Sequence, residues 1–138
     1  MRKVISVMLL ILIAWGTLGC SAPQEIPRED IVDKVYVYEK DGCGGNFTIE
    51  IRADGTYDYY EGFLSSYIGL GEWSYSDGIL TLYEEASRFN EAREIEEVTN
   101  LYCFAVEKDT LIFSDKSSAN FRYVKVAYGE KFLAAPSR

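Results

Sequence analysis

The sequence predicts an all-β domain, an antiparallel meander of about eight short strands that closes into a small barrel. Apolar and polar residues alternate over short segments, and Gly-rich or Asp-Gly turns separate these segments. Aromatic residues make up 14% of the chain, with 11 tyrosines among them, and this composition favours β structure. We expect the sheet to close into a barrel because closure leaves no strand edge open.

The expected strands follow one another along the chain. The clearest is 46–52, in which Phe47, Ile49 and Ile51 share one face while the residues between them are polar. Asp54-Gly55 then predicts a tight hairpin turn. The expected strands are 34–39, 46–52, 56–61, 70–76, 79–82, 98–107, 110–114 and 120–126, within a barrel domain of 34–133 that is followed by a tail of 134–138.

A charged segment interrupts the alternation. Phe89, Ala92 and Ile95 recur at a three-residue spacing, and Glu84 and Arg88 stand at the distance of one helical turn. A charged run of this kind also suits a long loop between two strands. We therefore expect one short surface helix or an irregular hairpin loop near residues 86–97.

The N-terminus has the pattern of a secretory signal peptide. Arg2 and Lys3 precede an apolar run of 4–14, which is too short to span a bilayer comfortably. Thr17-Leu18-Gly19-Cys20 resembles the lipobox of bacterial lipoproteins. The resemblance implies a signal peptide of 1–19, acylation of Cys20, a lipidated tether of 20–33 and an extracytoplasmic protein anchored to the bacterial membrane. The alternatives are an ordinary signal peptide with an incidental cysteine, or an uncleaved anchor.

The charge balance excludes nucleic acid as a partner. The net charge is −8, and loss of residues 1–19 leaves 12 basic against 22 acidic residues, or −10. Nucleic acids and anionic lipid surfaces both attract positive protein surface. Contact with the membrane is therefore expected through the N-terminal lipid and not through a face of the domain.

We expect no enzyme activity, no catalytic residue, no metal and no cofactor. The chain contains no histidine, which excludes Ser-His-Asp and Cys-His catalysis and histidine-ligated zinc. Asp41-Gly42, Asp54-Gly55 and Asp77-Gly78 lack the spacing of a calcium loop and are explained as turns. The carboxylates of Glu84-Glu85 and of 94–97 would suit glycoside hydrolysis, but they lie in the charged segment, where a solvated surface is expected.

Two cysteines remain once Cys20 is acylated. Cys43 lies in a glycine-rich turn and Cys103 in an expected strand. Outside the cytoplasm such residues are able to pair. The sequence leaves open whether they form a disulfide or two separate thiols.

The hairpin pattern resembles that of small bacterial lipocalin-like lipoproteins. The resemblance rests on Asp54-Gly55-Thr56-Tyr57, Gly71-Glu72-Trp73 and 77–82, and it covers most of residues 34–132. An eight-stranded barrel is filled by its own side chains or holds one small ligand. The best interpretation is a protein that binds a small apolar or amphipathic ligand.

The candidate ligand-binding residues are aromatic. Tyr57, Tyr59 and Trp73 are expected to point into the barrel, where they stack on a ligand or simply fill the core. Phe63 and Tyr67 belong to an unusually apolar loop, 62–69, which folds over the barrel end or contacts another molecule. The alternative function is an envelope accessory module that binds a protein through the loop 63–68.

Overall fold

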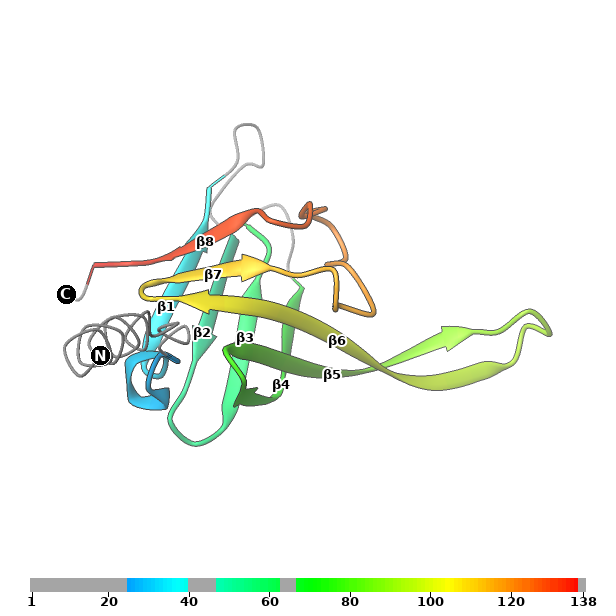
Figure 1. Cartoon of the computed structure of the whole chain (residues 1–138). Helices are drawn as coiled ribbons and strands as arrows, with labels where there is room; N and C mark the ends of the chain where they lie inside the picture. Colours follow the sequence, from blue (N-terminus) through cyan, green and yellow to red (C-terminus); the bar gives the residue numbers. More distant parts are fainter. Residues whose placement is uncertain (1–24, 40–46, 63–66, 137–138) are drawn as a thin grey trace, which may run out of the picture.

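The computed structural model describes residues 25–39, 47–62 and 67–136, and it shows a β-barrel with one short 3₁₀ turn (Figure 1). Cys20, Cys43 and Phe63 lie outside the described residues. The elements are η1 (Arg28–Asp30), β1 (Lys34–Tyr38), β2 (Phe47–Ile51), β3 (Thr56–Tyr60), β4 (Ile68–Ser76), β5 (Ile79–Phe89), β6 (Ile95–Glu107), β7 (Thr110–Phe113) and β8 (Lys131–Ala134).

The eight strands form a closed antiparallel meander in which each strand pairs with its neighbours in sequence. β8 completes the barrel because it pairs with both β7 and β1, and Tyr36 lies opposite Ala134 at the closure. The all-β fold, the meander and the barrel expected from the sequence are confirmed, and the architecture is consistent with a lipocalin-like barrel.

The barrel interior follows the two-residue period of the strands. In β2, Phe47, Ile49 and Ile51 are at most 1% exposed, while Thr48 and Glu50 face outward and are half-buried. Phe121, from the segment after β7, fills the centre of the core. Its ring stacks on Tyr102 at a centroid distance of 4.4 Å and meets Phe47 edge-on at 4.6 Å. Aromatic side chains therefore occupy the middle of the barrel.

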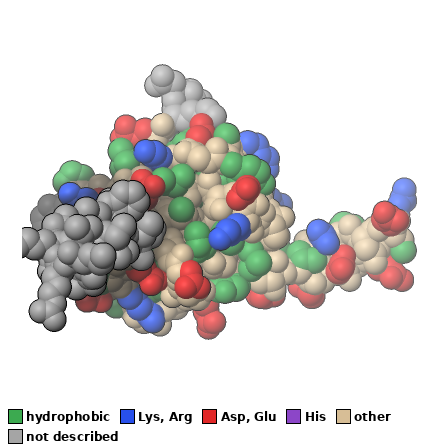
Figure 2. All heavy atoms as spheres, in the orientation of Figure 1, with side chains coloured by type: hydrophobic (Ala, Val, Ile, Leu, Met, Phe, Trp, Pro, Cys, Tyr) green, Lys and Arg blue, Asp and Glu red, His purple; other side chains and the backbone are tan. Residues whose placement is uncertain are grey.

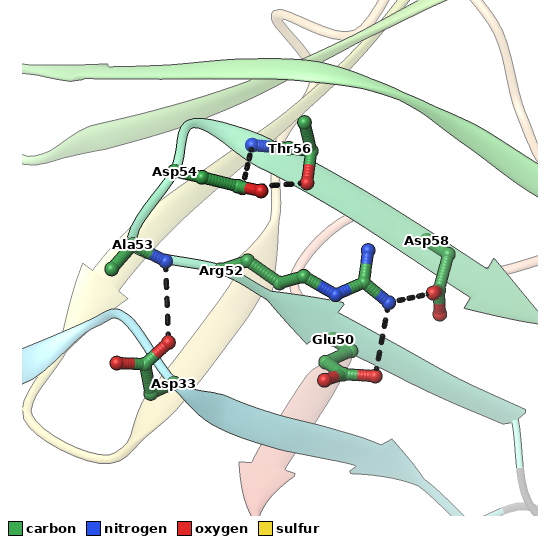
Figure 3. Close-up of polar contacts among 7 residues, drawn as sticks. All are labelled: Asp33, Glu50, Arg52, Ala53, Asp54, Thr56 and Asp58. Atoms are coloured by element: carbon green, nitrogen blue, oxygen red, sulfur yellow. Dashed lines mark hydrogen bonds and ion pairs between the residues drawn. The ribbon is translucent and has the colours of Figure 1, made fainter.

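The hairpin between β2 and β3 shows how polar contacts hold a turn (Figure 3). Oδ1 of Asp54 accepts hydrogen bonds from the backbone N–H of Thr56 at 2.9 Å and from its hydroxyl at 2.7 Å. These bonds hold the pKa of Asp54 below its usual value. Just before the turn, Arg52 lies on the outer wall between Glu50 and Asp58 and forms ion pairs with both. The Asp-Gly turn expected at this position is confirmed.

The charged segment forms neither a helix nor an irregular loop, because strands β5 and β6 continue through most of it. Their pairing runs from Ile79 opposite Ala105 to Phe89 opposite Ile95. The resulting hairpin projects far beyond the barrel (Figure 1). The three-residue spacing that suggested a helix places Phe89 and Ile95 on facing strands, with a turn between them. The short helix and the irregular loop expected near 86–97 are therefore both wrong in extent, because only residues 90–94 lie outside the paired strands.

The expected last strand, 120–126, is irregular, and the sheet closes instead through β8. The side chain of Asn120 accepts from the backbone N–H of Val126 at 3.1 Å and donates to its carbonyl at 2.8 Å. Such side-chain bonds compete with a strand ladder for the same backbone groups. Phe121 and Val126 are nevertheless buried. The apolar residues of this segment therefore pack into the core although its backbone does not pair with a neighbouring strand.

The described part of the tether packs on the barrel. Ile31 is fully buried, and its carbonyl accepts a hydrogen bond of 3.2 Å from the Tyr36 hydroxyl. The guanidinium of Arg28 lies 4.5 Å above the Trp73 ring, and Glu25 accepts from the backbone N–H of Gly78 in the β4–β5 turn. Among residues 25–39, 47–62 and 67–136, no helix has the length and apolar character needed to cross a bilayer.

Candidate functional site

A gap opens in the barrel wall where β4 and β5 separate. Their pairing starts at Ser76 opposite Ile79 and ends at Glu72 opposite Tyr83. Beyond this point β4 continues along β3, whereas β5 leaves with β6. An open depression of about 450 Å³ lies between the two diverging strands. It is lined by Tyr67, Ile68, Gly69, Leu70, Gly71, Glu72, Tyr83, Glu84 and Glu85.

The floor of this gap is a buried carboxylate. Glu84 is only 5% exposed, because it lies on the inward face of β5 in line with Leu80 and Leu82. Four side chains donate hydrogen bonds to it. Its Oε1 accepts from Tyr59 and Tyr67, both at 2.8 Å, and its Oε2 accepts from Tyr102 at 2.6 Å and from Asn100 at 3.3 Å.

The hydrogen bonds decide the charge of Glu84. Burial acts to raise the pKa of the carboxyl, but the donors from Tyr102, Tyr67 and Tyr59 together outweigh burial and hold the pKa below its usual value. Burial, together with the Glu84 charge, raises the pKa of the phenols that contact it. At neutral pH the site is therefore one negative carboxylate within a set of protonated tyrosines.

Two glycines of β4 make room for this arrangement. A Cβ on Gly69 would lie 2.0 Å from the ring of Tyr59, and a Cβ on Gly71 would lie 2.0 Å from the carbonyl oxygen of Tyr83. Tyr57 donates a hydrogen bond of 3.2 Å to that same carbonyl. The Gly-x-Gly pattern therefore allows the tyrosines and the β5 backbone to approach β4 at the point where the strands part.

The structure brings together three of the aromatic residues that the sequence singled out. Tyr59 and Tyr67 contact Glu84 directly, and Tyr57 contacts the backbone beside it. Trp73 lies elsewhere: it is 6% exposed, its Nε1 donates to the Arg52 carbonyl at 2.9 Å, and the N-terminal segment covers it. Phe63 lies outside the described residues, so its role stays a prediction.

Sequence reasoning missed Glu84 as a site residue, because it assigned this carboxylate to a solvated charged surface. A local signal was present. Leu80, Leu82 and Glu84 continue the two-residue period of a strand, which places Glu84 on the inward face.

A second buried carboxylate, Glu61, joins the end of β3 to the segment after β7. It is 3% exposed and accepts from three consecutive backbone N–H groups, of Arg122 at 3.0 Å, Tyr123 at 2.7 Å and Val124 at 2.6 Å. This anchoring places the Arg122 guanidinium 5.1 Å from the Tyr67 ring centroid. The segment around Arg122, more than fifty residues away in sequence, thus packs against Tyr67 at the rim of the gap.

Another open depression lies at the seam of β1 and β8. It has a volume of about 640 Å³ and is lined by Val37, Glu39, Lys131, Leu133, Ala134, Ala135 and Pro136. Its two charged residues, Glu39 and Lys131, are opposite in sign and lie on the surface. The gap beside β4 differs because a buried carboxylate with defined donors forms its floor.

Among the described residues Cys103 has no disulfide partner, and it is buried beneath the segment that follows β7. Its sulfur lies 3.8 Å from the Thr81 hydroxyl, and its backbone N–H donates to Ser117. Because Cys43 is outside the described residues, pairing of these two cysteines stays a prediction.

Within the described ranges, no group of three or more Cys, Asp or Glu side chains is placed to hold a metal ion. Comparison with protein-family models, with curated proteins and with solved structures gives no match.

Proposed function

We propose that this chain is a lipid-anchored extracytoplasmic protein that binds a small amphipathic ligand with a cationic group in the gap between β4 and β5. The observation that carries the proposal is the open depression of about 450 Å³ with a buried carboxylate at its floor. Clefts of this size hold small ligands when a few placed polar groups accompany an apolar lining.

The lining of the gap supports a ligand with both apolar and cationic parts. On the β4 side, Leu70 is 67% exposed and Ile68 is 57% exposed. Both side chains are able to contact the apolar part of a ligand. Glu72 and Glu85 flank the same depression, and Glu84 adds a negative charge below it. No lysine or arginine is among the lining residues, and the three carboxylates outnumber the one guanidinium described at the rim, that of Arg122, so the local field favours a cation.

The lipid anchor is proposed from the resemblance of 17–20 to a lipobox, with Cys20 as the acylated residue. The described end of the tether is consistent with it, because Glu25 and Arg28 contact the barrel at Gly78 and Trp73. Gly78 lies in the turn just before β5, whereas Glu84 lies halfway along this strand. The anchor would therefore approach one end of the barrel and leave the gap open to solvent.

Two detergent-like probes of equal chain length test the proposal. The secreted Cys20→Ser protein is titrated calorimetrically with decyltrimethylammonium and with decyl sulfate below their micellar concentrations. We expect saturable binding of the cation and much weaker binding of the anion. Leu70→Ser should weaken binding of the cation, whereas Leu133→Ser, in the other depression, should not. Equal binding of both probes, or equal loss in both variants, would contradict the proposal.

A second candidate is an envelope accessory module that binds a protein through the loop 63–68. Tyr67 lies at the end of this loop, and its ring centroid is 6.2 Å from that of Tyr123. Tyr123 is 59% exposed beside Arg122. An exposed tyrosine next to an arginine is typical of protein interfaces. Phe63→Ser with Tyr123→Ser should abolish co-purification of an envelope protein with the anchored chain, and unchanged co-purification would exclude this function.

A further inference from the structure

The part of the β5–β6 hairpin outside the barrel, residues 85–99, is here named the arm. Pairing of β5 with β4 ends at Tyr83, and pairing of β6 with β7 begins at Phe104. Among the described strands, the segments of β5 and β6 that belong to the arm pair only with each other. Figure 1 shows the arm extending into solvent on the side away from η1.

Cross-strand side-chain contacts hold the arm together in place of a core. The Ser87 hydroxyl donates to both carboxylate oxygens of Glu97, at 2.8 and 2.9 Å. Nε of Arg88 lies 3.5 Å from Oε2 of Glu96. At the tip, the Asn90 side chain accepts from the backbone N–H of Glu94 at 3.0 Å. A two-stranded ribbon is marginally stable alone in water. An arm of this length is therefore a structure that a binding partner would stabilise.

The tip of the arm presents an apolar pair. Phe89 and Ile95 lie directly opposite each other in the strand register. They are 73% and 69% exposed, so most of each side chain is open to solvent. Exposed apolar side chains with polar surroundings are typical of surfaces that bind another protein.

Acidic residues surround this pair along the arm (Figure 2). Between positions 85 and 97 there are five acidic residues against Arg88 and Arg93, a local net charge of −3. The acidic residues are Glu85, Glu91, Glu94, Glu96 and Glu97, all of them exposed. This charge opposes docking of a second copy of a chain with net charge −8 and of an anionic membrane.

We propose that the arm binds a partner protein whose surface carries lysines and arginines around an apolar hollow, and that Phe89 and Ile95 enter this hollow. The acidic flanks steer and orient the partner, and the apolar pair supplies the buried contact. Of these residues only Glu85 also lines the gap between β4 and β5, and the apolar pair lies outside it, so the inference does not depend on a ligand there.

Photo-cross-linking on the full-length chain in the cells that produce it tests the proposal. Benzoylphenylalanine is incorporated in place of Phe89 and, in a control, in place of Tyr128, which is 61% exposed on the barrel. We expect a light-dependent adduct from position 89 alone, with a partner protein whose cross-linked region is rich in Lys and Arg. No adduct, an adduct with a second copy, one with a protein lacking basic surface, or an equal adduct from both positions would overturn it.

A charge-reversal pair separates steering by the arm from a general effect of charge. Glu91→Lys with Glu94→Lys should lower the yield of the position-89 adduct by about tenfold, because attraction becomes repulsion. The control, Glu107→Lys, changes an exposed carboxylate at the other end of β6 and should leave the yield unchanged. An unchanged yield in the double variant would overturn the electrostatic part of the proposal.

Discussion

Tyr102 donates a hydrogen bond of 2.6 Å to Glu84 across the β5–β6 pair. The contact lies at the point where the barrel wall ends and the arm begins, because Glu84 is the first β5 residue beyond the pairing with β4. A short hydrogen bond from a phenol to a carboxylate is charge-assisted. It links the stability of the barrel to the negative charge at the floor of the gap.

Glu84→Gln should lower the free energy of unfolding by about 2 kcal/mol, because three phenols lose a charged acceptor and the amide brings donors of its own. Urea denaturation of the two proteins at neutral pH measures the difference. Glu85→Gln is the matched control: this neighbouring side chain is exposed and accepts only a hydroxyl bond from Thr99. A Glu84 variant as stable as the Glu85 control would contradict the assigned role.

The stability of the protein should fall in acid partly through Glu84. The pKa of this carboxyl is lowered in the folded state from its usual value of 4.5. Its contribution is therefore complete above pH 4.5 and disappears as the pH falls through the lower, folded-state pKa. Urea midpoints measured from neutral pH down to below this range should decline more steeply for the wild type than for Glu84→Gln. Parallel curves would show that Glu84 does not contribute.

Gly71→Ala should lower the free energy of unfolding by about 2 kcal/mol, because its Cβ would lie 2.0 Å from the Tyr83 carbonyl oxygen and force the strands apart. Ser76→Ala, an exposed position on the same strand, serves as the control for a change in β4. Thermal unfolding of both variants gives the comparison. If Gly71→Ala unfolds at the same temperature as the control, the close approach of β4 and β5 is wrong.

Glu61→Gln should release the segment around Arg122, because the amide keeps only one acceptor oxygen for three backbone N–H groups. Hydrogen exchange resolved by residue measures the result. The amides of Arg122, Tyr123 and Val124 should exchange much faster in the variant, while amides of β2 keep their protection. Unchanged exchange at these three positions would mean that Glu61 does not hold the segment.

The sequence was sufficient for elements whose signals are local. The alternation in β2 and the Asp54-Gly55 turn are set by neighbouring residues, and both are present as expected. The arm was ambiguous because its stability depends on contacts such as Ser87 with Glu97, ten residues apart. No periodicity within one segment distinguishes such pairs from the charge spacing of a helix.

The errors near the C-terminus and in the site have a similar origin. Residues 120–126 alternate like a strand, but Asn120 and the distant Glu61 take up their backbone groups. Trp73 was expected beside the tyrosines because all face inward. Trp73 lies at a different level along the barrel axis from the tyrosines. The alternation of residues in a strand predicts which face a side chain occupies but not its level along the axis. Tyr59 and Tyr67 were identified as aromatic, yet their role depends on the hydroxyls that reach Glu84.

The most direct test of the proposed function is a residue-resolved NMR titration of the Cys20→Ser protein with decyltrimethylammonium. We predict saturable amide shifts concentrated at 67–72 and 83–85, with decyl sulfate leaving these amides unchanged. Shifts concentrated instead at Val37, Lys131 and Leu133 around the other depression, or the absence of saturable shifts, would contradict the assignment of the gap between β4 and β5 as the binding site.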